Sequence, residues 1–367
     1  MKKLSAILIT LVISVSSILT GCGSTSQQEQ KQPTTVPGTT ITEPKNTTQT
    51  TTTATQQQNI DYTTVKPNEN GKVVVMMFHA FDNSFTPTKG NPGDYITTFN
   101  AFRDTLQTLY DKGFRVISMT DYLNNNISVP AGYKPIVFTF DDGTVGQFNL
   151  VEENGKLVAN KESAVGIMEE FNKQHPDFGL KGTFYVNLNN EKTFNGKGTL
   201  AERLKYLIDN SFEIGNHTLD HAVLGSIKSA DKIIEEVGGN QKKMDELVPG
   251  YKMTTLALPE GSYNKALKDY IIKGTYQGMQ YENKAIMLVG AEPAYSPVSK
   301  SFNPLLTARI RSTGIHKVEC DFDWWLQKFD TAGLYVSDGN PDTVAVPKDK
   351  EKNVDTVKLN GKKLITY

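Results

Sequence analysis

Cysteine is almost absent from this chain of 367 residues, which contains only Cys22 and Cys320. Two cysteines, one of them near the N-terminus, cannot supply the disulfide framework of a small secreted scaffold, so the fold must depend on a hydrophobic core. We expect Cys320 to be a buried small apolar residue rather than a nucleophile, because it has no partner.

An excess of charge of one sign is also missing. The chain has 39 Lys and Arg against 40 Asp and Glu, a formal net charge of −1, and it contains no long basic run. Nucleic-acid-binding proteins carry basic patches that neutralise phosphates. We therefore expect no nucleic-acid partner.

An apolar stretch long enough for a permanent membrane span is lacking at the N-terminus, where residues 4–20 follow Met1-Lys2-Lys3. This layout predicts a secretory signal. The stretch ends in Leu19-Thr20-Gly21-Cys22, which resembles the lipobox of bacterial lipoproteins. The resemblance implies an exported protein, anchored to the outer face of the bacterial cell membrane by a lipid on Cys22. The alternative is an ordinary signal peptide that happens to contain a cysteine.

Large apolar residues are nearly absent from residues 24–68, which are rich in Ser, Thr, Gln and Pro. Such a segment cannot bury enough surface to offset its chain entropy, so we expect a disordered stalk. The predicted organisation is a signal peptide at 1–22, a linker at 23–70, a folded domain at 71–335, and a C-terminal tail at 336–367. We assign the tail no role.

Apolar runs and helical patterns alternate along the predicted domain, and this α/β alternation favours a parallel sheet with helices outside it, closed or nearly closed into a barrel. Asn154-Gly155 predicts a hairpin turn. The expected strands are 73–78, 116–119, 135–140, 182–186, 212–215, 254–258 and 285–289. The expected helices are 99–110, 164–172, 200–208, 227–247 and 265–272, with the fourth interrupted at Gly238-Gly239.

The residues with the strongest chemical signal are Asp141 and Asp142, at the end of an apolar strand, and the pair His217 and His221. At a fraying strand end both carboxylates can turn into one cleft, although strand neighbours normally point to opposite sides. The histidines would lie one turn apart on a helix. One Asp with two His leaves coordination positions open, as in a catalytic metal site.

Simpler interpretations exist for each of these features. Asp-Asp-Gly could be only a turn, and the two histidines could be ordinary surface or core residues. We expect His79 to be a packed or supporting residue rather than a third imidazole ligand. Trp324-Trp325 could stack on sugar rings, but a helix packed on the barrel explains them better.

Residues 139–143 (Thr-Phe-Asp-Asp-Gly) and 217–221 (His-Thr-Leu-Asp-His) resemble the first two motifs of the polysaccharide deacetylases, also called the NodB homology or carbohydrate esterase family 4 group. Residues 75–79 and 181–186 resemble strands of the same family. This similarity extends over 73–311. It implies a distorted (β/α)7-type barrel, a divalent metal, most often zinc with cobalt or nickel as alternatives, and removal of acetyl groups from glycans.

Carried over by position, the resemblance implies that Asp142, His217 and His221 hold the metal and that Asp141 is the general base. The third family motif aligns with 256–261, where Ala257 replaces the Arg that normally steadies the catalytic Asp. The sequence therefore does not determine the orientation of the Asp141 side chain or whether its carboxyl group is ionised.

The same motif implies that Pro259 contacts substrate and that the backbone N–H of Glu260 stabilises an oxyanion. The family's Leu-x-His motif, which supplies the general acid, has no match, so His316 is the candidate acid. Residues 285–311 resemble members that act on poly-N-acetylglucosamine, and Arg309 of this region is a candidate substrate-binding residue.

We therefore expect a metal-dependent hydrolase that removes acetyl groups from N-acetylglucosamine residues of a cell-surface or extracellular polysaccharide, either exopolysaccharide or peptidoglycan. One alternative is a catalytically weak or inactive glycan-binding lipoprotein, and another is an O-acetyl esterase of the xylan type. The expected partners are an acetylated glycan polymer and the membrane that holds the lipid anchor. We expect a monomer.

Overall fold

A computed structural model describes residues 60–367, so the predicted signal peptide, Cys22 and most of the predicted linker lie outside the described residues. Within 60–367, every helix is too short or too polar to cross a membrane. The strands are β1 (Val74–Phe78), β2 (Ala80–Phe81), β3 (Ile96–Thr97), β4 (Phe114–Ile117), β5 (Lys134–Asp141), β6 (Leu150–Glu153), β7 (Lys156–Ala159), β8 (Thr183–Val186), β9 (Glu213–Asn216), β10 (Thr255–Ala257), β11 (Lys273–Tyr276), β12 (Met279–Glu282), β13 (Ala285–Met287), β14 (Ile310–Arg311), β15 (Thr343–Val346) and β16 (Lys363–Thr366). The α-helices are α1 (Tyr62–Val65), α2 (Phe99–Asp111), α3 (Met119–Leu123), α4 (Ala164–Gln174), α5 (Leu200–Asp209), α6 (Ala230–Leu247), α7 (Lys268–Ile272) and α8 (Phe322–Leu326). Short 3-10 helices are η1 (Pro259–Gly261), η2 (Lys265–Leu267), η3 (Pro304–Leu306), η4 (Lys348–Asn353) and η5 (Thr356–Leu359).

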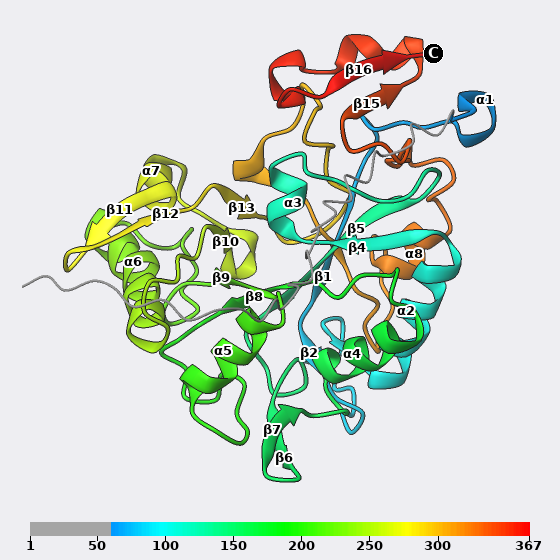
Figure 1. Cartoon of the computed structure of the whole chain (residues 1–367). Helices are drawn as coiled ribbons and strands as arrows, with labels where there is room; N and C mark the ends of the chain where they lie inside the picture. The colour runs from blue at the N-terminus through cyan, green and yellow to red at the C-terminus, as the bar shows by residue number, and fades with distance from the viewer. Residues whose placement is uncertain (1–59) are drawn as a thin grey trace, which may run out of the picture. The chain divides into compact units, whose positions relative to one another are not determined.

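The main sheet is curled and entirely parallel, in the order β13-β10-β9-β8-β5-β1-β14 (Figure 1). An additional strand, β4, pairs with residues 134–137 of β5, whereas β8 pairs with residues 139–141. The two strands therefore share one edge of β5, which distorts the barrel at that position. This architecture confirms the predicted α/β fold with a distorted (β/α)7-type barrel.

The barrel is closed by one short segment, residues 307–311. Thr307 pairs with Met287 at the end of β13, and β14 at the other end of the segment pairs with β1. Because this segment touches both edges of the sheet, its side chains lie next to residues from distant parts of the sequence. Arg309 is one of them.

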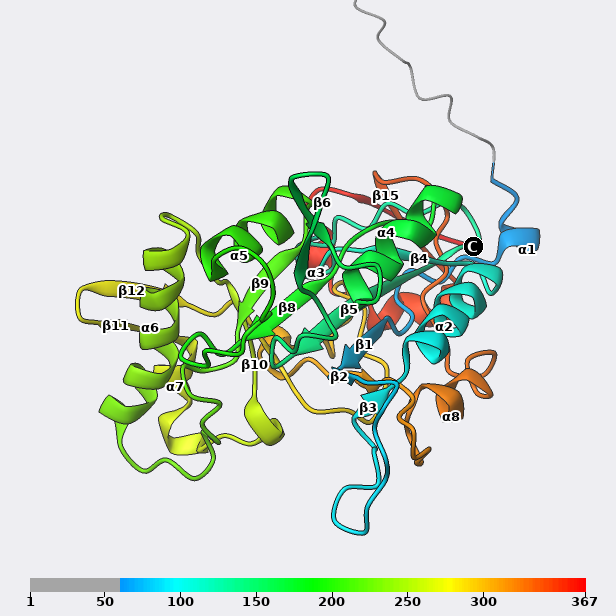
Figure 2. The ribbon, with the colours of Figure 1, turned by 90° about the horizontal axis from the view of Figure 1, so that it is seen from below.

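Apolar side chains fill the interior, and capped helices cover the outside of the sheet (Figure 2). All five residues of β1 are buried, as expected for a strand covered on both faces. Helix α2 begins where the Thr98 side chain accepts a bond from the Ala101 amide. Helix α5 begins with a capping box in which Thr199 and Glu202 bond each other's backbone amides.

The structure differs from the predicted elements in two places that have clear causes. Met119 starts α3 instead of ending a strand, because the Ser118 side chain caps the amide of Asp121. Helix α6 continues through Gly238-Gly239, which we expected to interrupt it. A Cβ atom on Gly238 would lie only 2.6 Å from Cβ of Tyr276, so this glycine permits close packing of β11 on the helix.

Both ends of the described chain belong to the folded unit. Residues 60–70, which we expected in the linker, form α1 and a bridge between Asn68 and Val336. The C-terminal tail forms the parallel pair β15–β16, and Figure 1 shows this pair beside α1. The rings of Tyr62 and Tyr367 stack with centroids 5.2 Å apart. The folded unit therefore begins about ten residues earlier than predicted and includes the tail.

Candidate metal centre and active site

The carboxyl ends of the barrel strands surround a cleft of about 600 Å³. Asp141 is the last residue of β5, and Asp142 follows it with a φ of 81°. This left-handed conformation ends the alternation of the strand, so both carboxylates reach the cleft, as the sequence predicted. The cleft is lined by His79, Tyr95, Asp141, Asp142, Asn187, Asn189, Asn190, His217, Asp220, His221, Leu258, Glu260 and Val289.

Three of these side chains form a cluster suited to a metal ion. Oδ1 of Asp142 lies 3.4 Å from Nε2 of His217 and 3.3 Å from Nε2 of His221. All three ligand atoms lie within 4.8 Å of one another, which matches the predicted ligand set. The histidines are not on a helix, contrary to our expectation. They follow β9 on a loop in which Thr218 and His221 have φ values of 62° and 55°, and this loop brings the rings together.

His217 is held in the orientation that a metal ligand needs. Its ring is 2% exposed, and Nδ1 lies 2.8 Å from the backbone oxygen of Ala257. Because a carbonyl oxygen only accepts, Nδ1 is the donor in this hydrogen bond, and the opposite ring nitrogen, Nε2, is turned towards Asp142. A hydrogen bond to the Asp142 carboxylate raises the pKa of the more exposed His221. Burial alone would raise the pKa of Asp142, but the two histidines hold it well below its usual range.

Asp141 forms a buried, bidentate pair with Arg309. Nη1 and Nη2 of Arg309 each lie 2.7 Å from one carboxylate oxygen, and the two side chains are 0% and 1% exposed. Arg309 also donates from Nε to the Leu288 oxygen at 2.8 Å. Burial by itself would raise the pKa of Asp141, but the charge of Arg309 and its hydrogen bonds outweigh this effect and lower the pKa. Asp141 is therefore an ionised carboxylate beside the cluster of Asp142, His217 and His221.

The position of Arg309 corrects one prediction and answers one question left open by the sequence. Arg309 is fully buried behind Asp141 and does not line the cleft, so it is not placed to bind substrate. It steadies Asp141 instead, which is the role that the resemblance implied for an Arg at position 257. The guanidinium reaches the same carboxylate from the segment that closes the barrel.

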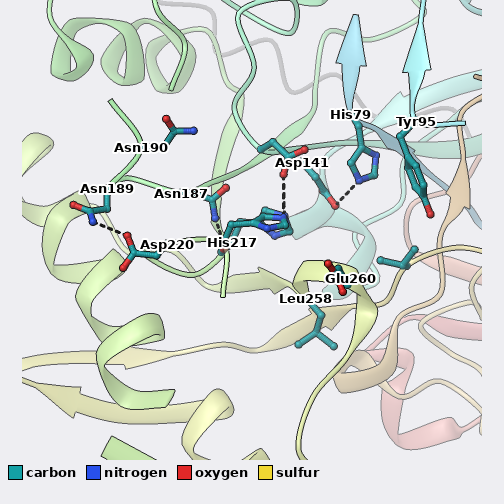
Figure 3. A pocket seen from close by; sticks show the side chains of 13 residues that line it. His79, Tyr95, Asp141, Asn187, Asn189, Asn190, His217, Asp220, Leu258 and Glu260 are labelled. Atoms are coloured by element: carbon teal, nitrogen blue, oxygen red, sulfur yellow. Dashed lines mark hydrogen bonds and ion pairs between the residues drawn. The ribbon is translucent and has the colours of Figure 1, made fainter. Parts of the chain in front are cut away.

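His79 is a cleft residue whose role the sequence did not reveal. Its Nε2 lies 3.8 Å from Oδ2 of Asp141, and its ring packs edge-on against Tyr95 with centroids 4.8 Å apart (Figure 3). Nδ1 is buried and has no hydrogen-bond partner among residues 60–367. Burial lowers the pKa of His79. One signal was available in the sequence: His79 follows a predicted strand as Asp142 does, but only the structure shows that these two strands, β1 and β5, are paired.

The remaining predicted site residues are placed as follows. Glu260 lines the cleft with a φ of 54°, while the preceding Pro259 is buried and is not among the described residues that line the cleft. His316 is not among them either. Its exposed ring lies 2.6 Å from a carboxylate oxygen of Asp94, so the structure does not bring this candidate acid to the cluster.

Comparison with known proteins agrees with this geometry. Residues 128–279 match the family model described as polysaccharide deacetylase. The deacetylase PplD from Streptococcus pyogenes, in complex with acetate, superposes with a TM-score of 0.51 at 18% identity, over 70% of this chain and 97% of that chain. BC0361, a polysaccharide deacetylase from Bacillus cereus, superposes with a TM-score of 0.50 at 18% identity, over 71% of this chain and 68% of that chain. No curated protein matches the sequence.

At these identities the superpositions establish a shared fold, and the family match covers the metal cluster and Asp141. His79 and Arg309, which complete the site, lie outside the matched segment. Residues 128–279 thus match the polysaccharide deacetylase family, and the barrel that contains them has the fold of solved deacetylases.

Proposed function

We propose that this protein is a metal-dependent hydrolase that removes acetyl groups from N-acetylglucosamine residues of a cell-surface or extracellular polysaccharide. One observation carries the proposal: a cluster of Asp142, His217 and His221 lies beside an ionised carboxylate, Asp141, that is not part of the cluster. Binding a metal does not require Asp141. A buried carboxylate held next to a metal site by its own arginine is the arrangement expected for a general base.

The cluster fits a divalent cation such as zinc, with cobalt and nickel as alternatives. Asp142, His217 and His221 would hold it, leaving room for further ligands from the cleft. Such a cation supplies Lewis acidity, which makes an acetyl carbonyl more electrophilic and a water more acidic.

The protein's own residues account for the movement of the proton. Asp141 is ionised and faces the cleft, so it is able to accept a proton from the attacking water. His79 lies 3.8 Å from Asp141, and burial lowers the pKa of its ring. We infer that Asp141 passes this proton to Nε2 of His79 and that His79 donates it to the nitrogen that leaves when the amide bond breaks, so that Asp141 ends ionised and His79 ends as it began. Arg309 touches neither water nor substrate, and it orients Asp141 and keeps it charged.

The lining of the cleft suits a sugar chain. Tyr95 is 42% exposed and contributes an aromatic ring to the lining, while Asn189, Asn190 and Asp220 contribute polar groups. The complex of the related PplD fold with acetate supports a product of this kind. Export and a lipid anchor at Cys22 are also part of the proposal, and they rest on the sequence alone.

The proposal is tested by measuring acetate released by the purified protein with zinc or cobalt, and after treatment with a chelator. The substrates are N-acetylglucosamine oligomers, peptidoglycan and acetylxylan. We expect metal-dependent release from the oligomers or from peptidoglycan. Release from acetylxylan alone would support the O-acetyl esterase, and glycan binding without any release would support the non-catalytic alternative.

A further inference from the structure

A second, smaller cavity of about 180 Å³ adjoins the catalytic cleft. Tyr95 and Val289 line both spaces, so the two cavities adjoin at these side chains. The rest of the small cavity is lined by Met77, Gly290, Ala291, Arg311, Glu319 and Cys320. This volume has room for a carboxylate group and several water molecules.

Arg311 is the cation of this cavity, and the structure gives it no anionic partner. Residues 309 and 311 belong to one extended segment, so their side chains share a face of the sheet. The guanidinium of Arg309 forms an ion pair with Asp141. Among residues 60–367, Arg311 forms no ion pair. Its Nε is buried and has no hydrogen-bond acceptor within the same part of the chain.

The guanidinium of Arg311 is held in place by stacking. Its Cζ lies 4.8 Å from the centroid of the Tyr95 ring, and the Tyr95 ring also packs against His79. Stacking leaves the edge of a guanidinium free, and that edge is the part that binds a carboxylate through two parallel N–H bonds. An oriented arginine without a partner, in a cavity beside the cleft, is suited to a planar anion.

We propose that this cavity is a carboxylate-binding subsite, with Arg311 as the residue that binds the carboxylate. Two carboxylates are relevant to the chemistry proposed above. One is the acetate that hydrolysis releases, and the other is an acidic substituent on the sugar chain. The connection with catalysis rests on the proposed function, but the binding of a carboxylate does not. Glu319 also lines the cavity, and its exposed negative charge opposes such binding.

Binding is measured on the metal-free full chain, so that no ligand attaches to a cation and no turnover occurs. The ligands are acetate, N-acetylmuramic acid and the uncharged N-acetylglucosamine. The affinity of each is measured by isothermal titration calorimetry, and the binding of acetate is also measured by NMR with a carbon-13 label. The variants are Arg311→Gln, Arg311→Lys and Glu319→Gln. The matched control is Arg103→Gln, which removes a half-exposed arginine of α2 that pairs with Glu162. Thermal unfolding confirms that each variant is folded.

We expect Arg311→Gln to bind carboxylates about tenfold more weakly, because a charge-assisted bidentate pair is lost. The carboxylate affinity of Arg311→Lys should lie between those of Arg311→Gln and the wild type. Glu319→Gln should bind carboxylates more tightly than the wild type, and Arg103→Gln should bind them with the wild-type affinity. Tighter binding of N-acetylmuramic acid than of acetate would identify a sugar substituent as the ligand, whereas equal binding would identify the released acetate. Unchanged binding in both Arg311→Gln and Glu319→Gln, or no carboxylate binding by the wild type, would overturn the proposal.

Discussion

At the scale of single residues, the pairing of Asp141 with Arg309 determines how the site works. Both side chains are almost completely buried, so each charge depends on the other for compensation. The two parallel hydrogen bonds, both 2.7 Å long, also fix the plane of the carboxylate. Such a pair contributes orientation and ionisation to Asp141, which a general base needs.

Replacing Arg309 with Ala should leave a buried, uncompensated carboxylate. We expect the free energy of unfolding at pH 7 to fall by about 3–5 kcal/mol, and turnover to fall because the pKa of Asp141 rises. Arg309→Lys should recover part of the stability but less of the turnover, since a lysine cannot form two parallel bonds. Urea unfolding and acetate release measure these effects. A folded Arg309→Ala protein with wild-type turnover would contradict the assignment.

His79 and His316 provide a matched comparison for the general acid. We expect His79→Gln to lower turnover by about 10²–10⁴, the usual contribution of acid–base catalysis, while metal content stays the same. His316→Gln should have no effect on turnover, because His316 lies outside the cleft beside Asp94. Acetate release by metal-loaded variants distinguishes the two. Loss of turnover only in His316→Gln would mean that the proton comes from a different part of the molecule.

The sequence revealed some of these residues and not others for a physical reason. Asp141, Asp142, His217 and His221 stand in short local patterns at strand ends, so they were predictable before the structure. His79 and Arg309 have roles that depend on which strand ends lie beside their own in the folded barrel. A single sequence contains no information about those contacts, and Arg309 was accordingly assigned to the substrate.

At the scale of elements, helix α6 shows how packing overrides local preference. Glycine disfavours a helix by about 1 kcal/mol relative to alanine, so Gly238-Gly239 predicted a break. The structure shows an unbroken helix with Tyr276 and Tyr281 packed directly on Gly238. The main-sheet strands β1, β4, β5, β8, β9, β10 and β13 and the helices α2, α4, α5 and α7 were predictable within a few residues because their apolar periodicity follows burial. The loop that carries the two histidines was not, since hydrogen bonds to Asn216 and Asn187 hold its backbone and no periodic pattern marks them.

We therefore expect Gly238→Ala to destabilise the protein, although alanine is the better helix former. The added Cβ would lie 2.6 Å from Cβ of Tyr276, and overpacking of this kind costs about 1–3 kcal/mol. Gly90→Ala is the control, because a Cβ at Gly90 meets no atom within 4 Å. Urea unfolding of both variants measures the difference. Equal or increased stability of Gly238→Ala would mean that the tyrosines move away at little cost.

At the scale of the whole molecule, buried Glu69 joins the two ends of the described chain. One carboxylate oxygen accepts from the amide of Ala345 at 2.8 Å, and the other accepts from the Asp338 amide at 3.2 Å. Burial, followed by the charge of Asp338, raises the pKa of Glu69 from 4.5 to about 7. The C-terminal segment is therefore attached to the barrel through a carboxyl group that binds its proton more tightly in the folded state.

This shift predicts how stability depends on pH. A carboxyl group with a raised pKa in the folded state contributes stability that is fully present below pH 4.5 and is lost as the pH rises through 7. The shift corresponds to on the order of 3 kcal/mol. We expect this loss in the wild type and in the exposed control Glu152→Gln, but not in Glu69→Gln. The measurement is urea unfolding from pH 4.5 to 8, and equal pH profiles for the three proteins would refute the prediction.

The most direct test of the whole account compares metal content and turnover in two variants of neighbouring residues. Asp142→Ala should lose the metal and, with it, all acetate release, because one of three ligands is gone. Asp141→Asn should retain one divalent ion per chain but release acetate at least about 10²-fold more slowly, because the base is gone. If Asp141→Asn turns over near the wild-type rate, or if Asp142→Ala still binds one ion, then these two carboxylates do not have the separate roles assigned to them.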